Sequence, residues 1–284
     1  MMRREVNWAA AVRRLDGTIA TTGRTLSPSV KPWRRIPLVR GMVALVETTV
    51  LGVRATLWAA RERGQDDGSD FSAGGLVTAV LVAFVAVFGI FGLLPAVVVK
   101  TMGVRNPLAF SLIEGVLRIV ILVAYLAAIG RSARIRRVFG FHGAEHMTIH
   151  AFEHGAPLRS DEIRRFDRRH PRCGTAFLLV VALTSILVHA LIGHPSWPVL
   201  VASRVLGLPV VAGLAYEAIR FAGRHPSSVV GRLVRAPGEW LQSLTTAPPD
   251  DDMIEVAVAA LEAVLVLEAE AAEAVADVDV TGAA

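Results

Sequence analysis

The uncharged run over residues 74–99 constrains the fold of this chain more than any other feature. It contains no Asp, Glu, Lys, Arg or His. A helix of about 20 apolar residues crosses the hydrocarbon core of a bilayer. A soluble core does not need an apolar segment of this length. The run therefore predicts a transmembrane helix, and with it an integral membrane protein.

Three further apolar segments, 108–129, 176–193 and 197–216, predict three more transmembrane helices. The resulting fold class is mainly α, a polytopic membrane protein with about four transmembrane helices. The helical pattern over 36–60 is different, because charges recur every seventh residue from Arg40 to Arg54. A charged stripe of this kind favours an interfacial or re-entrant helix.

The two ends of the chain predict smaller elements. Asp16-Gly17 lies between short runs with alternating polarity, which indicates a β-hairpin at the N-terminus. Residues 222–252 are rich in Pro and Gly and predict irregular structure. Residues 253–276 predict an acidic helix that is too charged to span, and that packs on this chain or on a partner protein.

The distribution of basic residues predicts the orientation. Twelve Lys and Arg precede residue 74, ten lie in 130–172 and four follow residue 216, whereas the opposite loops hold only Lys100 and Arg105. The positive-inside rule then places both termini and the 130–172 loop in the cytoplasm, beneath the cell membrane. The net charge of +5 is thereby assigned to membrane flanks and not to nucleic acid. The predicted organisation is a cytoplasmic cap (1–35), an interfacial helix (36–60), two transmembrane helices (74–129), a cytoplasmic loop (130–172), two further transmembrane helices (173–217) and a cytoplasmic C-terminal segment (218–284).

The cytoplasmic loop concentrates metal-binding residue types. Five of the eight histidines and the only cysteine lie within 32 residues, from His142 to Cys173. If this stretch is helical, His142, His146 and Glu153 share one stripe, flanked by Glu145 and His150. Two imidazoles four residues apart can bind one divalent ion. The cluster therefore predicts a metal site, with zinc as its expected ion.

The order His142-x-x-Glu145-His146 also matches the inverzincin metallopeptidases. In such a site Glu145 is the expected catalytic base, which takes a proton from the bound water, or a further ligand. Those enzymes take a third ligand, a glutamate, from a later helix, for which Glu217 is the candidate. Glu153, His170 and Cys173 compete for the same role, since imidazole and thiolate both suit zinc.

Two alternatives to the metal site stay open. The histidines suit polar loop residues beside lipid headgroups. Cys173 also suits a nucleophile activated by His170 or Arg172.

Charged residues inside the apolar segments form a second group. Glu114 and Arg118 are four residues apart, which suits a helical ion pair. Arg204 and His189 are predicted at a similar depth. Because charges inside a bilayer are costly, these side chains are expected to face one another. They indicate either a structural clamp or the ion path of a transporter.

Several motifs are similar to those of a known family. The chain resembles the YqhQ-like family of uncharacterised bacterial membrane proteins over nearly its whole length to about residue 260. Relatives are labelled as predicted metal-dependent enzymes on the same histidines, and no substrate is established for them. The motifs that carry the resemblance are Ile36-Pro-Leu-Val-Arg-Gly41, Arg136-Arg137-Val138-Phe139, His142-Gly-Ala-Glu-His146, His170-Pro-Arg-Cys-Gly-Thr175, Pro209-Val-Val-Ala-Gly213, Tyr216-Glu217, Ala236-Pro-Gly238, Trp240-Leu-Gln242 and Leu244-Thr-Thr246.

The chain departs from this family in two places. Relatives usually begin with Gly-Gly-Gln-Ala leading into Val-Met-Met-Arg-Gly, whereas this sequence starts at Met1-Met2-Arg3. Either the start codon was placed late or this segment is gone, and in the second case a glycine-rich turn near the site is missing. Met147 also stands where relatives often have lysine.

The leading functional hypothesis is a divalent-metal site at the cytoplasmic membrane interface, in a hydrolase of unknown substrate. The alternatives are a non-catalytic membrane scaffold, in which the cluster is structural, and an ion or proton transporter. The lipid bilayer is the expected partner, and the sequence identifies no protein partner or oligomeric state.

Overall fold

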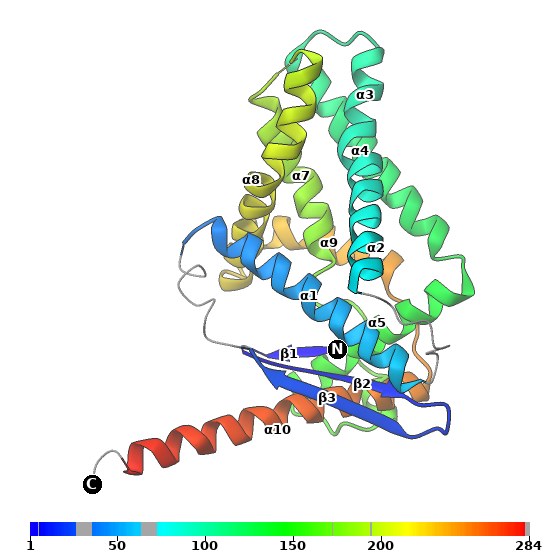
Figure 1. The fold of residues 1–284 in the computed structure, drawn as a ribbon, viewed down its shortest axis with the longest axis vertical. Helices are drawn as coiled ribbons and strands as arrows, with labels where there is room; N and C mark the ends of the chain where they lie inside the picture. Colours follow the sequence, from blue (N-terminus) through cyan, green and yellow to red (C-terminus); the bar gives the residue numbers. More distant parts are fainter. Residues whose placement is uncertain (5, 27–35, 64–72, 172, 194, 282–284) are drawn as a thin grey trace.

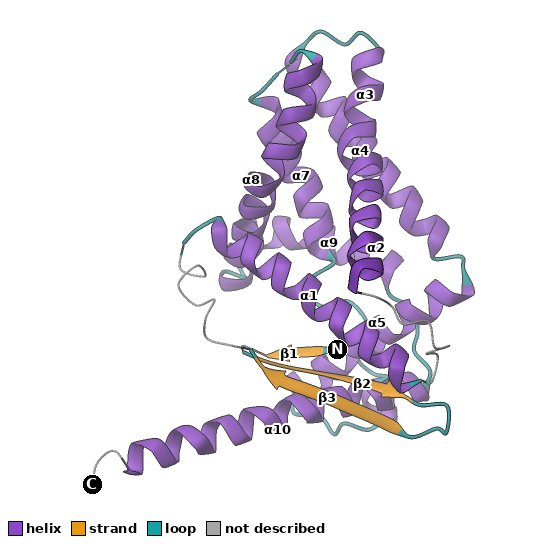
Figure 2. Ribbon diagram, in the orientation of Figure 1, coloured by secondary structure: helices purple, strands orange, loops and turns teal. Residues whose placement is uncertain are grey.

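The structure is a computed structural model that describes residues 1–4, 6–26, 36–63, 73–171, 173–193 and 195–281. Helices dominate it, and the only strands among these residues form a small sheet near the N-terminus (Figure 2). The predicted fold class, mainly α with a small N-terminal β element, is therefore confirmed.

The sheet is antiparallel in the order β1 (Met2–Arg4), β2 (Asn7–Arg13) and β3 (Ile19–Thr25). The hairpin expected at Asp16-Gly17 joins β2 to β3. Its turn is longer than two residues, since Arg14 N donates to Thr18 O at 2.8 Å and Gly17 adopts a φ of +89°. A glycine tolerates this left-handed backbone where other residues are strained. The third strand, β1, was not predicted.

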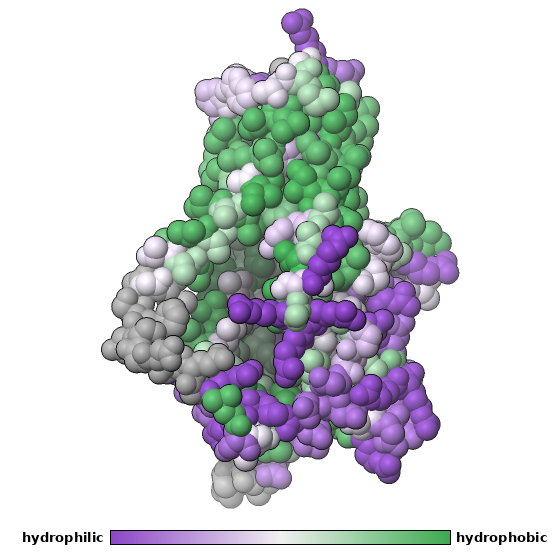
Figure 3. Space-filling view, turned by 90° about the vertical axis from the view of Figure 1, so that its right-hand side faces the viewer, coloured by the Kyte–Doolittle hydropathy of each residue, from purple (hydrophilic) through white to green (hydrophobic). Residues whose placement is uncertain are grey.

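A bundle of apolar helices forms the upper part of the molecule (Figure 1). Side chains such as Leu81, Val85 and Leu206 are 57%, 67% and 74% exposed, so the bundle does not bury its own apolar surface. Figure 3 shows the result as a broad apolar band above a hydrophilic base. A lipid environment suits such a surface. The bundle consists of α2 (Ala73–Val87), the π-helical turn η3 (Phe88–Leu93), α3 (Leu94–Thr101), α4 (Pro107–Ile129), α7 (Ala176–Ala190) and α8 (Trp197–Arg224).

Among the described residues, four helices are long and apolar enough to cross a membrane, but only three of them match predicted segments. The four are Val39–Glu62, Thr78–Thr101, Pro107–Ile129 and Trp197–Arg224. The helix expected over 176–193 is α7, which has only 15 residues and packs against α4, α8 and α9. The fourth helix of sufficient length and apolarity is α1 (Val39–Glu62), which was predicted to be interfacial. It runs obliquely below the bundle (Figure 1).

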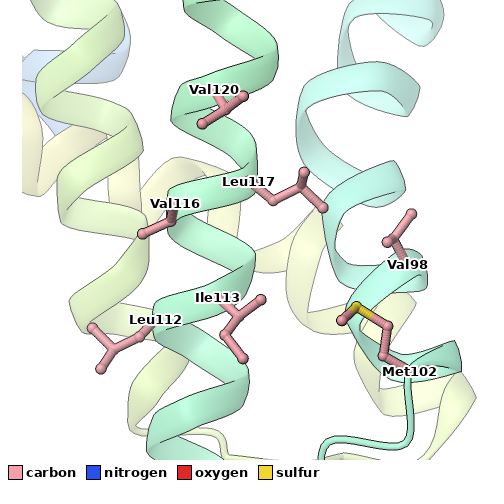
Figure 4. A pocket seen from close by; sticks show the side chains of 7 residues that line it. All are labelled: Val98, Met102, Leu112, Ile113, Val116, Leu117 and Val120. Atoms are coloured by element: carbon pink, nitrogen blue, oxygen red, sulfur yellow. The ribbon is translucent and has the colours of Figure 1, made fainter.

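A groove between α3 and α4 illustrates the character of the bundle surface (Figure 4). Seven side chains line it, and all are apolar, among them Val98, Met102 and Val116. It offers no polar group to an ion or a polar substrate.

The lower part of the molecule is built from the predicted loop and from the C-terminal segment. Most of 130–172 is helical, as α5 (Ala133–Glu153) and the short α6 (Ser160–Ile163). The acidic helix expected over 253–276 is α10 (Asp251–Thr281), which packs on the sheet and on α5. Their common core includes Ala144, Met147, Ile254 and Leu261.

The prediction of irregular structure over 222–252 is wrong for much of that range. Residues Val229–Thr245 form α9, which includes Pro237. The helix is amphipathic and packs against both α7 and α8. Gly238 permits the approach, because a Cβ there would lie 2.3 Å from Ala176 Cβ. Tertiary packing thus outweighs the helix-breaking residues in this segment.

The charges inside the bundle face one another, as predicted. Glu114 is 1% exposed and accepts hydrogen bonds from Arg118 Nη2 and Arg204 Nη2, each at 2.5 Å. Arg118 also donates to Phe91 O at 2.7 Å, in the π-helical turn. The nearby predicted member, His189, is buried, and among the described residues neither of its ring nitrogens has a hydrogen-bond partner. One carboxylate that joins two helices in this way supports the structural clamp.

Candidate metal centre

Helix α5 presents three histidines at successive turns, a fourth, His154, follows directly after its last residue, and each ring donates to a backbone carbonyl. A ring nitrogen that faces a carbonyl oxygen must carry the proton, because both atoms cannot be acceptors. In the neutral ring the opposite nitrogen then carries a lone pair. The pairs are His142 Nδ1 with Thr245 O at 2.8 Å, His146 Nδ1 with Arg168 O at 2.5 Å, His150 Nε2 with Arg169 O at 2.9 Å and His154 Nδ1 with His150 O at 2.8 Å.

The first group of possible ligands joins two of these histidines to the cysteine. His142, His146 and Cys173 each offer one ligand atom, and these atoms lie within 4.8 Å of one another. His142 Nε2 lies 3.2 Å from Cys173 Sγ, and the two imidazole centroids are 4.3 Å apart. Cys173 and His146 are buried, and His142 is partly buried. The two Nε2 atoms therefore converge with the sulfur in a largely enclosed site.

Gln242 on α9 holds the segment that carries the cysteine. Its side chain, which is fully buried, accepts from His170 N at 2.7 Å and donates to His170 O at 3.0 Å. The backbone then turns, with Cys173 N donating to His170 O at 3.2 Å. Since a buried amide satisfies both backbone groups, His170 and Cys173 are positioned beneath α5.

The electrostatics of the first group favour an ionised sulfur. Burial raises the pKa of the Cys173 thiol, but hydrogen bonds from His142 and His146 outweigh burial and bring the pKa down to about 5. Burial conversely lowers the pKa of His142, and its hydrogen bond to Cys173 more than offsets this, so the pKa is raised. At neutral pH the sulfur is a thiolate, the form that binds metal.

The second group lies beside the first, one turn further along α5. His150, Glu153 and His170 also offer ligand atoms within 4.8 Å of one another. His170 Nε2 lies 3.5 Å from Glu153 Oε2, and the His150 and His170 ring centroids are 4.6 Å apart. Burial and the neighbouring His150 lower the pKa of His170 to about 4, so its ring is neutral at pH 7.

The structure separates some residues that were predicted to lie together. Glu153 is not near His142, because 11 residues along a helix rise about 16 Å even when both side chains share a stripe. His150, which was predicted only to flank the stripe, is the α5 histidine that groups with Glu153. The series of histidines at i, i+4 and i+8 is the sequence signal that could have identified it.

The two remaining predicted residues lie outside both groups. Glu217 forms an ion pair with Arg40, which donates from Nε at 2.6 Å. Glu145 lies on α5 with its side chain 34% exposed, and Oε2 is 3.8 Å from the amino nitrogen of Met1. Arg172, predicted as a possible activator of Cys173, lies outside the described residues.

Gly143 allows α5 to approach the segment that orients His142. A Cβ at this position would lie 2.4 Å from Ala247 O, two residues beyond Thr245. We expect Gly143→Ala to displace this segment and to lower the free energy of unfolding by about 1–3 kcal/mol. Thermal unfolding in detergent measures the change. Gly52→Ala is the matched control, because nothing lies within 4 Å of its Cβ and the protein should be unchanged or slightly more stable. Equal effects of the two changes would contradict the prediction.

The comparisons with known proteins cover this region. A family model described as "Protein of unknown function (DUF1385)" matches residues 36–267, which include both groups. The chain is 29% identical over 285 residues to the "Uncharacterized protein YqhQ" of Bacillus subtilis (strain 168), covering 93% of this chain and 88% of that protein. No solved structure matches. Neither description names an activity, a metal or a membrane.

Proposed function

Because the chain belongs to the DUF1385 family, whose description leaves the activity open, we propose a function from the geometry of its own site. The protein is a membrane protein that holds a zinc-type divalent ion through His142, His146 and Cys173. The ion serves a hydrolytic reaction at the cytoplasmic face of the membrane.

One observation carries this proposal: two imidazole lone pairs and a thiolate meet at one point. The Nδ1 atoms of His142 and His146 are already bonded to Thr245 O and Arg168 O. A single proton could bridge only one nitrogen to the sulfur and would leave the other lone pair facing it. A cation satisfies all three atoms. Backbone carbonyls that orient histidine ligands are the usual surroundings of protein metal ions.

The donor atoms fit zinc. The 3.2 Å between His142 Nε2 and Cys173 Sγ is close to the separation of about 3.5 Å expected between nitrogen and sulfur ligands of one tetrahedral zinc. Thiolate and imidazole suit zinc far better than magnesium or calcium. The surrounding residues thus fit the ion that the sequence predicted.

An ion held by His142, His146 and Cys173 would supply Lewis-acid activation of a water or a substrate group. Of this chain's residues, Glu145 is the candidate base, since it precedes His146 on α5 and its carboxylate is partly exposed to solvent. The substrate class stays open between a membrane-proximal peptide, a lipid and a phosphate ester.

The membrane placement is proposed from the apolar helices and the basic residues. Among the described residues, three long apolar helices, Thr78–Thr101, Pro107–Ile129 and Trp197–Arg224, stand in the bundle with the shorter apolar α7. Helix α5, whose histidines contribute to both metal groups, lies in the base below them. We place this base and both termini in the cytoplasm, with α1 lying at the interface. We keep the predicted limits of the cytoplasmic segments in this proposal: 1–35 for the cap, 130–172 for the loop and 218–284 for the C-terminal segment.

A second candidate is a structural metal centre in a non-catalytic scaffold. The site joins α5 to the segment that carries Arg168 and Cys173 and to Thr245 at the end of α9. A metal ion there would tie three parts of the chain together without any reaction.

Metal analysis of protein purified in detergent without added metal tests the centre. We expect zinc in the wild-type chain, and its loss from the thiolate site in His142→Ala and in Cys173→Ser. His225→Ala is the matched control, because this histidine is exposed, lies in neither group, and its ring hydrogen-bonds to Phe221 O. Wild-type protein without metal would refute the proposal.

Glu145→Gln separates the enzyme from the scaffold. We expect the variant to keep its metal and its thermal stability, and to lose hydrolysis by about 10²–10⁴-fold, as befits the loss of a general base. A panel of ester, peptide and phosphoester substrates in mixed micelles gives the measurement. Metal-loaded wild-type protein that hydrolyses none of them would favour the scaffold.

A further inference from the structure

The group of His150, Glu153 and His170 is not used by the proposed centre. We propose that it binds a second divalent metal ion, so that α5 supports a two-metal site. The proposal does not rest on the thiolate centre, since the two groups share no ligand.

The ring of His150 is already oriented for this role. Its Nε2 bonds to Arg169 O at 2.9 Å, which leaves Nδ1 with the lone pair. The preceding carbonyl, Arg168 O, accepts from the other type of ring nitrogen, Nδ1, of His146 in the first group. Two successive peptide groups thus fix the tautomers of one histidine in each group. A chain that used His150 only as a polar surface residue would not need this arrangement.

The other two ligands are held independently. The buried Gln242 side chain holds the backbone of His170 through two hydrogen bonds, and His170 as a whole is 4% exposed. Glu153 approaches from the last turn of α5, with its carboxylate 3.5 Å from His170 Nε2. A simple ion pair between Glu153 and His170 would not account for the ligand atom of His150, which also lies within 4.8 Å of theirs.

The donors of the two groups differ in kind. Two imidazoles and a carboxylate are the ligand set of several zinc hydrolases, whereas the first group supplies a thiolate. A site without sulfur also accepts harder ions such as Mn²⁺ and Fe²⁺. The second group should therefore be less selective for zinc than the first.

The groups are adjacent but unequally buried. The ring centroids of His146 and His170 are 5.7 Å apart, so these two neighbouring imidazoles separate one centre from the other. Glu153 is exposed, whereas Cys173 is buried. A substrate that arrives from solvent would meet the second ion first, and the thiolate-bound ion would lie behind it.

Cobalt titration of the full-length, metal-stripped protein in detergent tests the proposal, because Co²⁺ reports on sulfur ligands. We expect two equivalents to bind to the wild-type chain, only one of which produces a thiolate-to-cobalt charge-transfer band. His150→Ala and Glu153→Gln should each weaken binding of the equivalent without the band by at least about 10–100-fold. Cys173→Ser should remove the band and keep the other equivalent.

His154→Ala serves as the matched control, because His154 is the next histidine along the chain, directly after α5, is exposed and lies in neither group. It should bind cobalt as the wild type does. A wild-type chain that binds one equivalent with the band, or variants at 150 and 153 that keep both equivalents, would overturn the second site. Binding without the band that His150→Ala abolishes would support the second site while refuting the thiolate centre. Circular dichroism of each variant shows that its helices are retained.

Discussion

Glu114→Gln is expected to prevent the chain from accumulating as a folded membrane protein. Glu114 is 1% exposed and neutralises two guanidinium groups, those of Arg118 and Arg204. The substitution keeps the shape of the side chain but leaves two buried cations without a counter-charge. Breaking a buried ion pair in this way costs about 3–5 kcal/mol, a large part of the roughly 5–15 kcal/mol that stabilises a folded domain. Yield in the membrane fraction and thermal unfolding in detergent give the measurement.

Two further variants distinguish this explanation from a general sensitivity to mutation. Asp161→Asn removes the acidic partner of Arg159 from an exposed pair, which should cost no more than about 1 kcal/mol. Adding Arg118→Met and Arg204→Met to Glu114→Gln should restore much of the yield, because no uncompensated charge is left. If Glu114→Gln accumulated as well as Asp161→Asn, the clamp would not stabilise the fold.

Removing bound metal with a chelator is expected to lower the thermal midpoint by roughly 5–10 °C. Without a cation, a single proton can bridge only one of the two imidazoles to the Cys173 sulfur, and the other faces the sulfur with a lone pair. A ligand present at 100 times its dissociation constant stabilises a fold by about 2.7 kcal/mol, and each kcal/mol moves the midpoint of a chain of this size by roughly 2–4 °C. The core that α5 forms with α10 should remain folded, because it is built from apolar residues.

Cys173→Ser and His225→Ala complete this experiment. Cys173→Ser should unfold below the untreated wild type. The chelator should lower its midpoint less than it lowers that of the wild type, because only the ion of the second group is left to remove. His225→Ala should respond to the chelator as the wild type does, because this histidine lies outside both groups. A wild-type chain whose midpoint stays constant while its metal is shown to leave would contradict a stabilising centre.

The two experiments address separate parts of the protein. The clamp lies within the apolar bundle and holds α4 to α8, whereas the metal groups lie in the hydrophilic base. Changes at Glu114 should therefore affect insertion and yield. Changes at Cys173 should affect metal content in a chain that still assembles.

Local sequence patterns were sufficient for several elements. The uncharged run over 74–99 predicts a long apolar helix, because a soluble core does not need one. Asp16-Gly17 predicts the hairpin between β2 and β3, although not the length of its turn, because this dipeptide favours a chain reversal. The facing of Glu114 and Arg204 also followed, since a charge inside a bilayer must find a partner. Each of these conclusions depends on chemistry within one segment or on the cost of exposing charge to lipid.

The composition of the metal groups was decided by tertiary structure. A helical wheel gives the direction of a side chain but not its height along the axis, so it could not show that Glu153 groups with His150 and His170 while His142 groups with His146 and Cys173. The partner of Cys173 depends on Gln242, in a helix that the sequence did not predict, and Glu217 pairs instead with Arg40 on α1. These contacts join residues far apart in the chain, whose separation is set by packing and not by any local period. The histidines that make a metal site possible can be read from the sequence, whereas only the folded chain determines which atoms share one ion.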